Sequence, residues 1–416
     1  MTIDLLSAIP RLRPLDIRPI LYEGQPFLYL RDPLSLSDKT IILPQTLAPI
    51  LMLLDGSRDP SAVSASCAIR FGLRVSVQNI QDLVNALDQA FLLENETSHQ
   101  AMQKKLADYR QAPYRKSCCA GQSFPADKED LKNLLDSWLN EAVEVGNETA
   151  LFSSASQTIG AICPHIDYER GHKTYAALWK NLLPMLEDVE LVIIFGTDHY
   201  SQRSVITLTQ QNYATPFGVL ENDEALIQLL AREIGEEKVF AEELHHANEH
   251  SIELALIWLH YLLQAKPSVR GFKLLPVLCG DLIHADEQDL ALADQVCSLL
   301  RDAMQDRKTL VIAAADLSHV GPAFGGDPVD LLKRALVKEA DEHLLKLIQE
   351  GKAEEFLQAL RSINNRHNVC GVTPIYFTLK ITQPKAGTLI AHEFCPADEH
   401  RTSWVSICGV TLDSHV

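Results

Sequence analysis

The chain has 416 residues, enough for two or three domains that each close a core. Its apolar content of 46% and charged content of 22% are ordinary for a folded protein and exclude collagen-like or wholly disordered chains. A net charge of −18 repels phosphate backbones and anionic headgroups, so we expect neither nucleic acid nor a membrane as a partner. No apolar stretch approaches a bilayer span and no secretion signal is visible, so we expect a cytoplasmic protein. None of the nine cysteines forms a C-x-x-C pair, which argues against a disulfide framework or a four-cysteine zinc site.

Residues 1–95 predict a small winged-helix-like domain. Apolar segments on either side of Glu23-Gly24 predict a hairpin from Ile17 to Leu30, and the apolar run Phe91–Leu93 predicts a closing strand. Helical patterns lie between them, at residues 44–54, 61–71 and 77–90. This segment has eight basic and ten acidic residues, so it has no excess of positive charge of the kind that a DNA-binding domain needs. A peptide- or partner-docking role and a purely packing role both remain open. The polar residues 96–112 are expected to form a linker or connecting helix.

The remaining chain alternates short apolar runs with longer helical patterns. After an amphipathic helix that starts at Asp127, predicted strands cover residues 159–163, 191–195, 272–278 and 309–313. Predicted helices cover residues 171–183, 223–234, 251–263 and 286–304. This alternation is typical of an α/β fold, in which helices cover both faces of a sheet.

Three of the predicted strands are followed by chemically similar residues. The first leads to His165, the second to Asp198 and His199, and the last to Asp316 and His319. Because ligands of open α/β sheets bind beyond the carboxyl ends of the strands, we expect these side chains to converge there. Imidazole and carboxylate groups are ligands for iron, copper and zinc, so the pattern indicates a metal or acid/base site. Spacing alone does not select the metal.

Eight motifs follow one another along the chain: AGQSFPAD from Ala120, CPHIDY around His165, GTDHY around His199, TPFG from Thr215, EHSIE around His250, LLPVLCGD from Leu274, AADLSHVG around Asp316 and NVCG around Cys370. This is the order found in Memo-like proteins, and the chain closely resembles their bacterial form, AmmeMemoRadiSam system protein B. The resemblance covers residues 113–416. The first 95 residues resemble, more distantly, a PqqD-type peptide-binding module.

The resemblance implies an αβα fold related to class III extradiol dioxygenases. It places the metal ligands at His165, His199 and Cys370, with Fe(II) or copper as the metal and zinc as a substitute. It also places Asp316 beside the metal, and His319 and His250 as acid/base or second histidines of the pocket. The implied chemistry is of the non-haem oxygenase or oxidase type, acting on a small molecule or peptide. A radical-SAM protein and an AMMECR-type protein are the implied partners.

Two other functions remain open from the sequence. In the first, the chain is a non-catalytic scaffold whose pocket holds a peptide or partner. In the second, the string H-x-x-E-H from His246 to His250 forms a zinc peptidase site. The strongest apolar period begins only at Ile252 and Asn248 is a suitable helix cap, so we expect His246 to precede the helix. Asp167 is a further candidate carboxylate near the metal.

Overall fold

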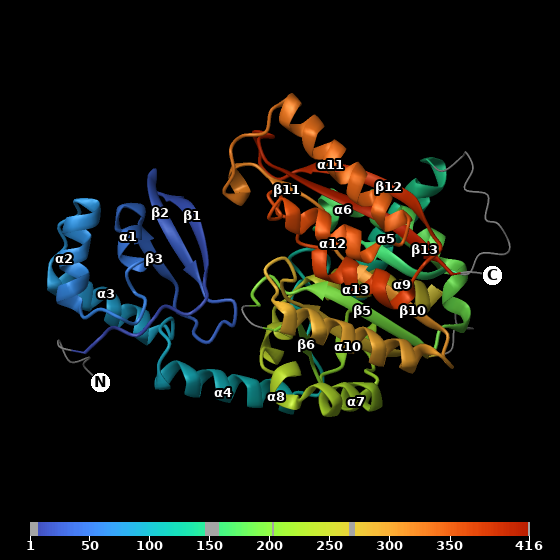
Figure 1. Ribbon diagram of the computed structural model, residues 1–416, viewed down its shortest axis with the longest axis horizontal. Coiled ribbons are helices and arrows are strands. Elements are labelled where there is room, and N and C mark those ends of the chain that lie inside the picture. The colour runs from blue at the N-terminus through green and yellow to red at the C-terminus, as the bar shows by residue number, and fades with distance from the viewer. Residues whose placement is uncertain (1–6, 146–157, 202–203, 266–270, 415–416) are drawn as a thin grey trace. The chain divides into compact units, whose positions relative to one another are not determined.

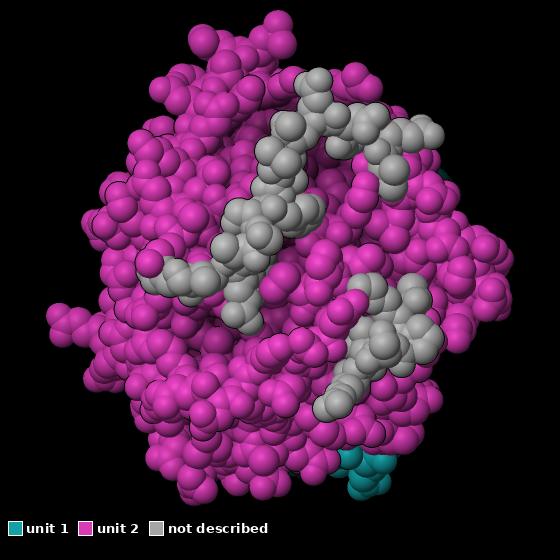
Figure 2. All heavy atoms as spheres, turned by 90° about the vertical axis from the view of Figure 1, so that its right-hand side faces the viewer, with its two compact units in different colours: residues 1–111 teal, residues 112–416 magenta. Residues whose placement is uncertain are grey.

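The computed structural model describes residues 7–145, 158–201, 204–265 and 271–414. The chain divides into two compact units, residues 1–111 and residues 112–416, which Figures 1 and 2 show as ribbons and as spheres. Within the described ranges, no helix is both long enough and apolar enough to cross a membrane.

The first unit is a three-stranded antiparallel sheet followed by helices. Its strands lie in the order β1-β2-β3. The bounds are β1 Asp16–Tyr22, β2 Gln25–Arg31, β3 Ile41–Pro44, α1 Ala48–Leu51, α2 Pro60–Phe71, α3 Val77–Gln89 and α4 Glu96–Gln111. Glu23 and Gly24 both have positive φ, which is what a two-residue hairpin turn requires. Asp59 and Ser76 cap α2 and α3 by accepting backbone N–H groups.

Two expectations for this unit are wrong. The segment from Phe91 to Leu93 makes only an isolated bridge, between Leu93 and Leu12, instead of a strand. Phe91 has a φ of 58°, a left-handed conformation that a regular strand does not contain. Residues 44–54 form a 3₁₀ turn and the single turn of α1 in place of one helix. The prolines at positions 44 and 49 restrict φ and leave no backbone donor, so a regular helix cannot run from the start of this segment through Pro49.

The second unit contains an eight-stranded mixed sheet, which confirms the expected α/β class. Seven strands follow the order β11-β13-β4-β10-β5-β9-β6, and β12 pairs with β13. The four predicted strands form its parallel centre, β4-β10-β5-β9. The bounds are β4 Thr158–Cys163, β5 Leu191–Thr197, β6 Ile206–Leu208, β9 Lys273–Cys279, β10 Thr309–Ala314, β11 His319–Val320, β12 Ala386–Pro396 and β13 Trp404–Asp413, with β7 Tyr213–Thr215 and β8 Gly218–Leu220 forming a separate pair.

Helices cover both faces of this sheet (Figure 1). One layer consists of α5 Lys128–Val145, α6 Tyr168–Leu182 and α9 Ser251–Ala265. The other consists of α7 Glu224–Ile234, α8 Glu236–Val239, α10 Glu287–Met304, α11 Leu331–Gln349, α12 Ala353–Ser362 and α13 Val372–Thr382. Side chains of the central strands alternate between the two apolar clusters: Ile193 and Phe195 lie in one, and Val192 and Ile194 in the other. Both faces of the central strands are therefore buried, as a parallel sheet requires.

Candidate metal centre

The site is built at the carboxyl ends of three neighbouring parallel strands. β10 pairs with β4 on one side and with β5 on the other. His165 stands two residues beyond β4, Asp316 two beyond β10 and His199 two beyond β5. The structure thus brings these three strand-end residues together, whereas the carboxylate of Asp198 accepts from the Nδ1–H of His245 at 2.8 Å.

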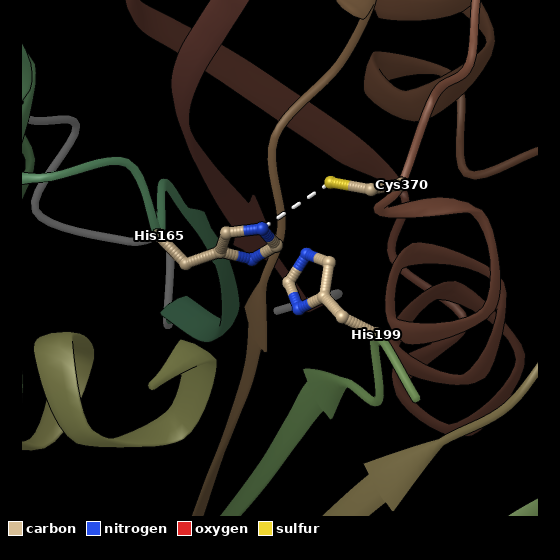
Figure 3. Close-up of side chains that lie close together, drawn as sticks. All are labelled: His165, His199 and Cys370. Carbon is tan, nitrogen blue, oxygen red and sulfur yellow. Dashed lines mark hydrogen bonds between the residues drawn. The ribbon is translucent and has the colours of Figure 1, made fainter. Parts of the chain in front are cut away.

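Cys370 reaches the same place from the loop before α13. Gly371 N–H donates to the Asp316 carbonyl at 3.1 Å. A Cβ at position 371 would lie 2.5 Å from the Ala315 Cβ, so only glycine permits this approach. Donor atoms of His165, His199 and Cys370 all lie within 4.8 Å of one another. Figure 3 shows the three side chains directed toward a common point.

Backbone contacts orient the ring of His165. Its Nδ1–H donates to the Ala314 carbonyl at 2.9 Å, which leaves the Nε2 lone pair facing the Cys370 Sγ at 3.2 Å. Burial, together with the neighbouring rings of His199 and His250, lowers the pKa of His165 well below its usual value. His165 is therefore neutral, the form in which imidazole binds a metal.

Glu249 orients His199 from the opposite side. The His199 Nδ1–H donates to the Glu249 carboxylate at 3.1 Å, so its Nε2 is the free donor atom. The same carboxylate accepts backbone N–H groups of His199, His250 and Ser251. Burial opposes its charge, but His199 and His250 hold the pKa of Glu249 well below its usual value. A carboxylate behind a metal-binding histidine is a common outer partner of metal sites.

This position of Glu249 is not evident from the sequence. The residue was considered only as part of H-x-x-E-H, and nothing in the string indicates that its carboxylate faces His199, fifty positions earlier in the chain. Gly196 supplies part of the explanation, because a Cβ there would lie 2.5 Å from Ile252. Because position 196 has no Cβ, the start of α9 can approach β5, and this brings Glu249 to the site.

The three expected acid/base residues also lie here. Asp316 is buried and its Oδ1 accepts the His165 backbone N–H at 2.8 Å. The ring of His250 stacks on that of His199, with centroids 5.0 Å apart. Burial lowers the pKa of His319 to about 4, and the Nδ1–H of its neutral ring donates to the Leu317 carbonyl at 3.0 Å. By contrast, Asp167 caps α6 and pairs with Arg170, so its carboxylate has a structural partner.

The geometry argues against the peptidase interpretation. His246 lies in a 3₁₀ turn, Glu243–Ala247, before α9, as expected. Its Nδ1 is 2.6 Å from the Tyr213 hydroxyl and its Nε2 is 2.9 Å from the Thr207 carbonyl. Both ring nitrogens are therefore committed to protein partners, and His246 has no lone pair to share with an ion that His250 binds.

We expect His246 to make the fold sensitive to acid. Burial lowers the pKa of His246 to about 3, whereas an unfolded histidine titrates near 6.5. Between these values the unfolded chain binds the extra proton, so stability is lost as the pH falls. Titration of this residue should lower the free energy of unfolding by about 2 kcal/mol between pH 7 and pH 5.

Denaturant titrations at both pH values measure this effect, with His246→Gln as the comparison. Glutamine can accept from Tyr213 and donate to Thr207 without titrating. The variant should therefore lose about 2 kcal/mol less than the wild type on acidification. Equal losses in the two proteins would contradict the assignment.

Comparison with known proteins agrees with this architecture. A family model described as Memo-like protein matches residues 115–411. A MEMO1 family protein of Aquifex aeolicus is 27% identical over 395 residues, covering 92% of this chain and 94% of that protein. One from Thermus thermophilus is 26% identical over 331 residues, covering 78% and 90%. One from Pyrococcus furiosus is 30% identical over 268 residues, covering 62% and 83%. The Aquifex alignment is longer than residues 112–416, so it extends into the first unit.

Proposed function

The chain belongs to the Memo-like family, and we propose that its second unit binds one redox-active metal ion, Fe(II) or copper, through His165, His199 and Cys370. The observation that carries this proposal is the approach of three donor atoms to within 4.8 Å of one another. Without an ion to bind, two imidazoles and one thiol from three separate segments would be an unusual set of neighbours.

The donor set fits a first-row metal ion. For a tetrahedral ion with typical metal–sulfur and metal–nitrogen bonds, the nitrogen and sulfur atoms stand about 3.5 Å apart. The observed Nε2 to Sγ distance of 3.2 Å for His165 and Cys370 is close to this value. Both histidines present Nε2 to the ion. The Nδ1–H of His165 donates to the Ala314 carbonyl, and the Nδ1–H of His199 donates to the Glu249 carboxylate. The side chains are thus already oriented for a shared ion.

The thiol determines which metals suit the site. Burial raises the pKa of Cys370 well above its usual value, so an incoming ion must displace the thiol proton. Thiolate is a soft donor that favours Cu(I), while the two imidazoles suit iron, copper and zinc alike. We regard zinc as a substitute for the redox metal. A bound iron or copper ion would supply one-electron and dioxygen chemistry of the oxygenase or oxidase type.

The surrounding residues are suited to orient a substrate and to move a proton. The side chains of His199 and His250 are 30% and 41% exposed, so a small molecule or a peptide can reach this side of the site. Glu249 raises the pKa of His250 against the opposing effect of burial. His319, whose pKa is lowered by burial, is neutral and can accept a proton. Burial raises the pKa of Asp316, so this carboxyl group takes up a proton more readily than an exposed aspartate does. The proposed partnership with a radical-SAM protein and an AMMECR-type protein rests on sequence resemblance alone.

Replacing Cys370 tests the sulfur ligand. A serine hydroxyl is a poor donor for soft ions, so Cys370→Ser should weaken Cu(I) binding by at least about 100-fold and Fe(II) binding by less. Competition with a chromophoric chelator under anaerobic conditions gives both affinities. Cys297→Ser, in a buried position on α10, is the matched control and should leave them unchanged. Unchanged Cu(I) affinity in Cys370→Ser would remove the thiol from the site.

Replacing Glu249 tests the outer partner of His199. Glu249→Gln keeps the size of the side chain but removes its charge, and metal affinity should fall by about 10- to 100-fold. The control is Glu393→Gln, which alters a carboxylate that accepts from Thr174 on a different part of the sheet. If Glu249→Gln and Glu393→Gln both bind metal like the wild type, Glu249 does not help to hold His199 as a ligand.

A further inference from the structure

Two adjacent thiols stand in contact at the start of the second unit. The Sγ atoms of Cys118 and Cys119 are 3.5 Å apart. The loop that carries them is fixed by Glu253 on α9, whose carboxylate accepts the backbone N–H groups of Cys118 at 2.9 Å and Cys119 at 3.0 Å. The two thiols are therefore held in contact by the fold, beyond what adjacency in the sequence requires.

A buried cation faces one of these thiols. The Arg115 side chain pairs with Glu253, and its Nη2–H donates to the Cys118 Sγ at 3.2 Å. Arg115 also donates to the carbonyls of His246 and Glu249, which fixes the guanidinium in place. A guanidinium that cannot move away stabilises the thiolate form of Cys118 over the thiol.

The two cysteines differ in ways that assign them different chemistry. Cys118 is partly exposed, whereas Cys119 is 7% exposed. The hydrogen bond from Cys119 lowers the pKa of Cys118 and Arg115 acts in the same direction, while burial and the Glu253 carboxylate oppose them. The pKa of Cys119 is raised, chiefly by the same hydrogen bond and by burial. A partly exposed cysteine whose pKa is lowered, with a second thiol in contact, is the arrangement of a reactive cysteine and its resolving partner.

We propose that Cys118 and Cys119 are a redox pair, which a hydroperoxide oxidises to a disulfide between the neighbouring residues and a dithiol reduces again. This activity is separate from metal binding by His165, His199 and Cys370. Glu253 cannot complete a metal site with the two thiols, because one carboxylate oxygen accepts from Arg115 and Cys118 and the other from Ser117 and Cys119.

The oxidation proceeds in two balanced steps. The Cys118 thiolate attacks one peroxide oxygen, so an S–O bond forms, the O–O bond breaks and the departing oxygen takes up a proton. Cys118 is now a sulfenic acid, oxidised by two electrons, and the peroxide is reduced. The Cys119 sulfur then attacks the Cys118 sulfur, forming the S–S bond and breaking the S–O bond. The hydroxide leaves with the Cys119 proton as water.

The geometry of adjacent residues makes such a bond readily reversible. Neighbouring Cα atoms across a trans peptide are about 3.8 Å apart, which is shorter than the separation usual in disulfides. A disulfide formed there is strained, and strained disulfides are the ones most easily reduced. We therefore infer a sensor-like or catalytic thiol pair in preference to a structural crosslink.

Thiol mapping on the full chain tests the proposal. Protein reduced with dithiothreitol and freed of metal is treated with one equivalent of hydrogen peroxide under argon, then alkylated and digested. The peptide containing positions 118 and 119 should be lighter by two hydrogen atoms and unalkylated, and dithiothreitol should restore both thiols. If this pair stays reduced while other cysteines react, the proposal is wrong.

Two variants and one control separate the steps. Cys119→Ser should stop at a sulfenic acid on Cys118, which a cyclic 1,3-dione traps. Cys118→Ser should leave Cys119 reduced at the same peroxide dose, and Cys297→Ser should react like the wild type. A Cys118→Ser chain that binds fewer metal ions than the wild type would instead assign the pair to a metal site and overturn the redox role. Because the oxidation is measured without metal, its failure leaves the proposed metal centre untouched, and the reverse also holds.

Discussion

Replacement of His165 or His199 by alanine is expected to reduce bound metal from one ion per chain to a trace. Each variant removes one of the three proposed protein donors, so metal affinity should fall by more than the 10- to 100-fold loss typical of an outer partner. Element-resolved metal analysis after anaerobic reconstitution with Fe(II), Cu(I) and Zn(II) measures the loss directly. His199→Ala is the cleaner variant, because its side chain is 30% exposed and its removal leaves no closed cavity.

His343→Ala is the matched control for both variants. His343 lies exposed on α11, and the His343→Ala variant should bind metal like the wild type. Circular dichroism on every variant confirms that the fold is retained. If His165→Ala and His199→Ala kept a full ion while folded, the chain would not use these histidines, and the scaffold function would replace the metal centre.

The largest loss of stability is expected from breaking the buried ion pair of Arg115 and Glu253. Their side chains are 0% and 1% exposed. Removing one partner leaves an uncompensated charge in the interior, so Arg115→Met should lower the free energy of unfolding by about 3–5 kcal/mol. Denaturant titration measures the change. The double variant Arg115→Met with Glu253→Leu should be less destabilised than Arg115→Met alone, because no charge is left unpaired.

An exposed pair provides the contrast. Lys132 and Asp136 form an ion pair on the surface of α5, where water screens both charges. Lys132→Met should therefore shift the unfolding midpoint far less than Arg115→Met. Comparable shifts in the two variants would mean that burial of the Arg115–Glu253 pair does not matter to the fold.

The parallel centre of the sheet was predictable because its strands are continuous apolar runs. β4, β5, β9 and β10 are buried on both faces, so they stand out without any alternation. The rule that ligands gather at the carboxyl edge then placed His165, His199 and Asp316 together. The edge strands were harder to predict. β12 is half exposed along most of its length, and it has a bulge beside β13.

The rest of the site depends on tertiary contacts that the sequence does not announce. Cys370 follows no strand, and only the family resemblance selected it among nine cysteines. Its position depends on Gly371, which packs against Ala315 where a Cβ would not fit. The role of Glu249 was not recognised because the H-x-x-E-H string suggested another function. Its partner His199 follows β5, whereas Glu249 precedes α9. Such pairings arise from how helices pack on the sheet, and periodicity within one segment contains no information about them.

X-ray absorption at the metal edge of the reconstituted chain tests the central claim most directly. The protein is reduced, loaded anaerobically with one equivalent of Cu(I) or Fe(II), and its first coordination shell is fitted. We expect one sulfur scatterer together with imidazole nitrogens, and loss of the sulfur in Cys370→Ser. A shell of nitrogen and oxygen alone in the wild type would contradict a centre built from His165, His199 and Cys370.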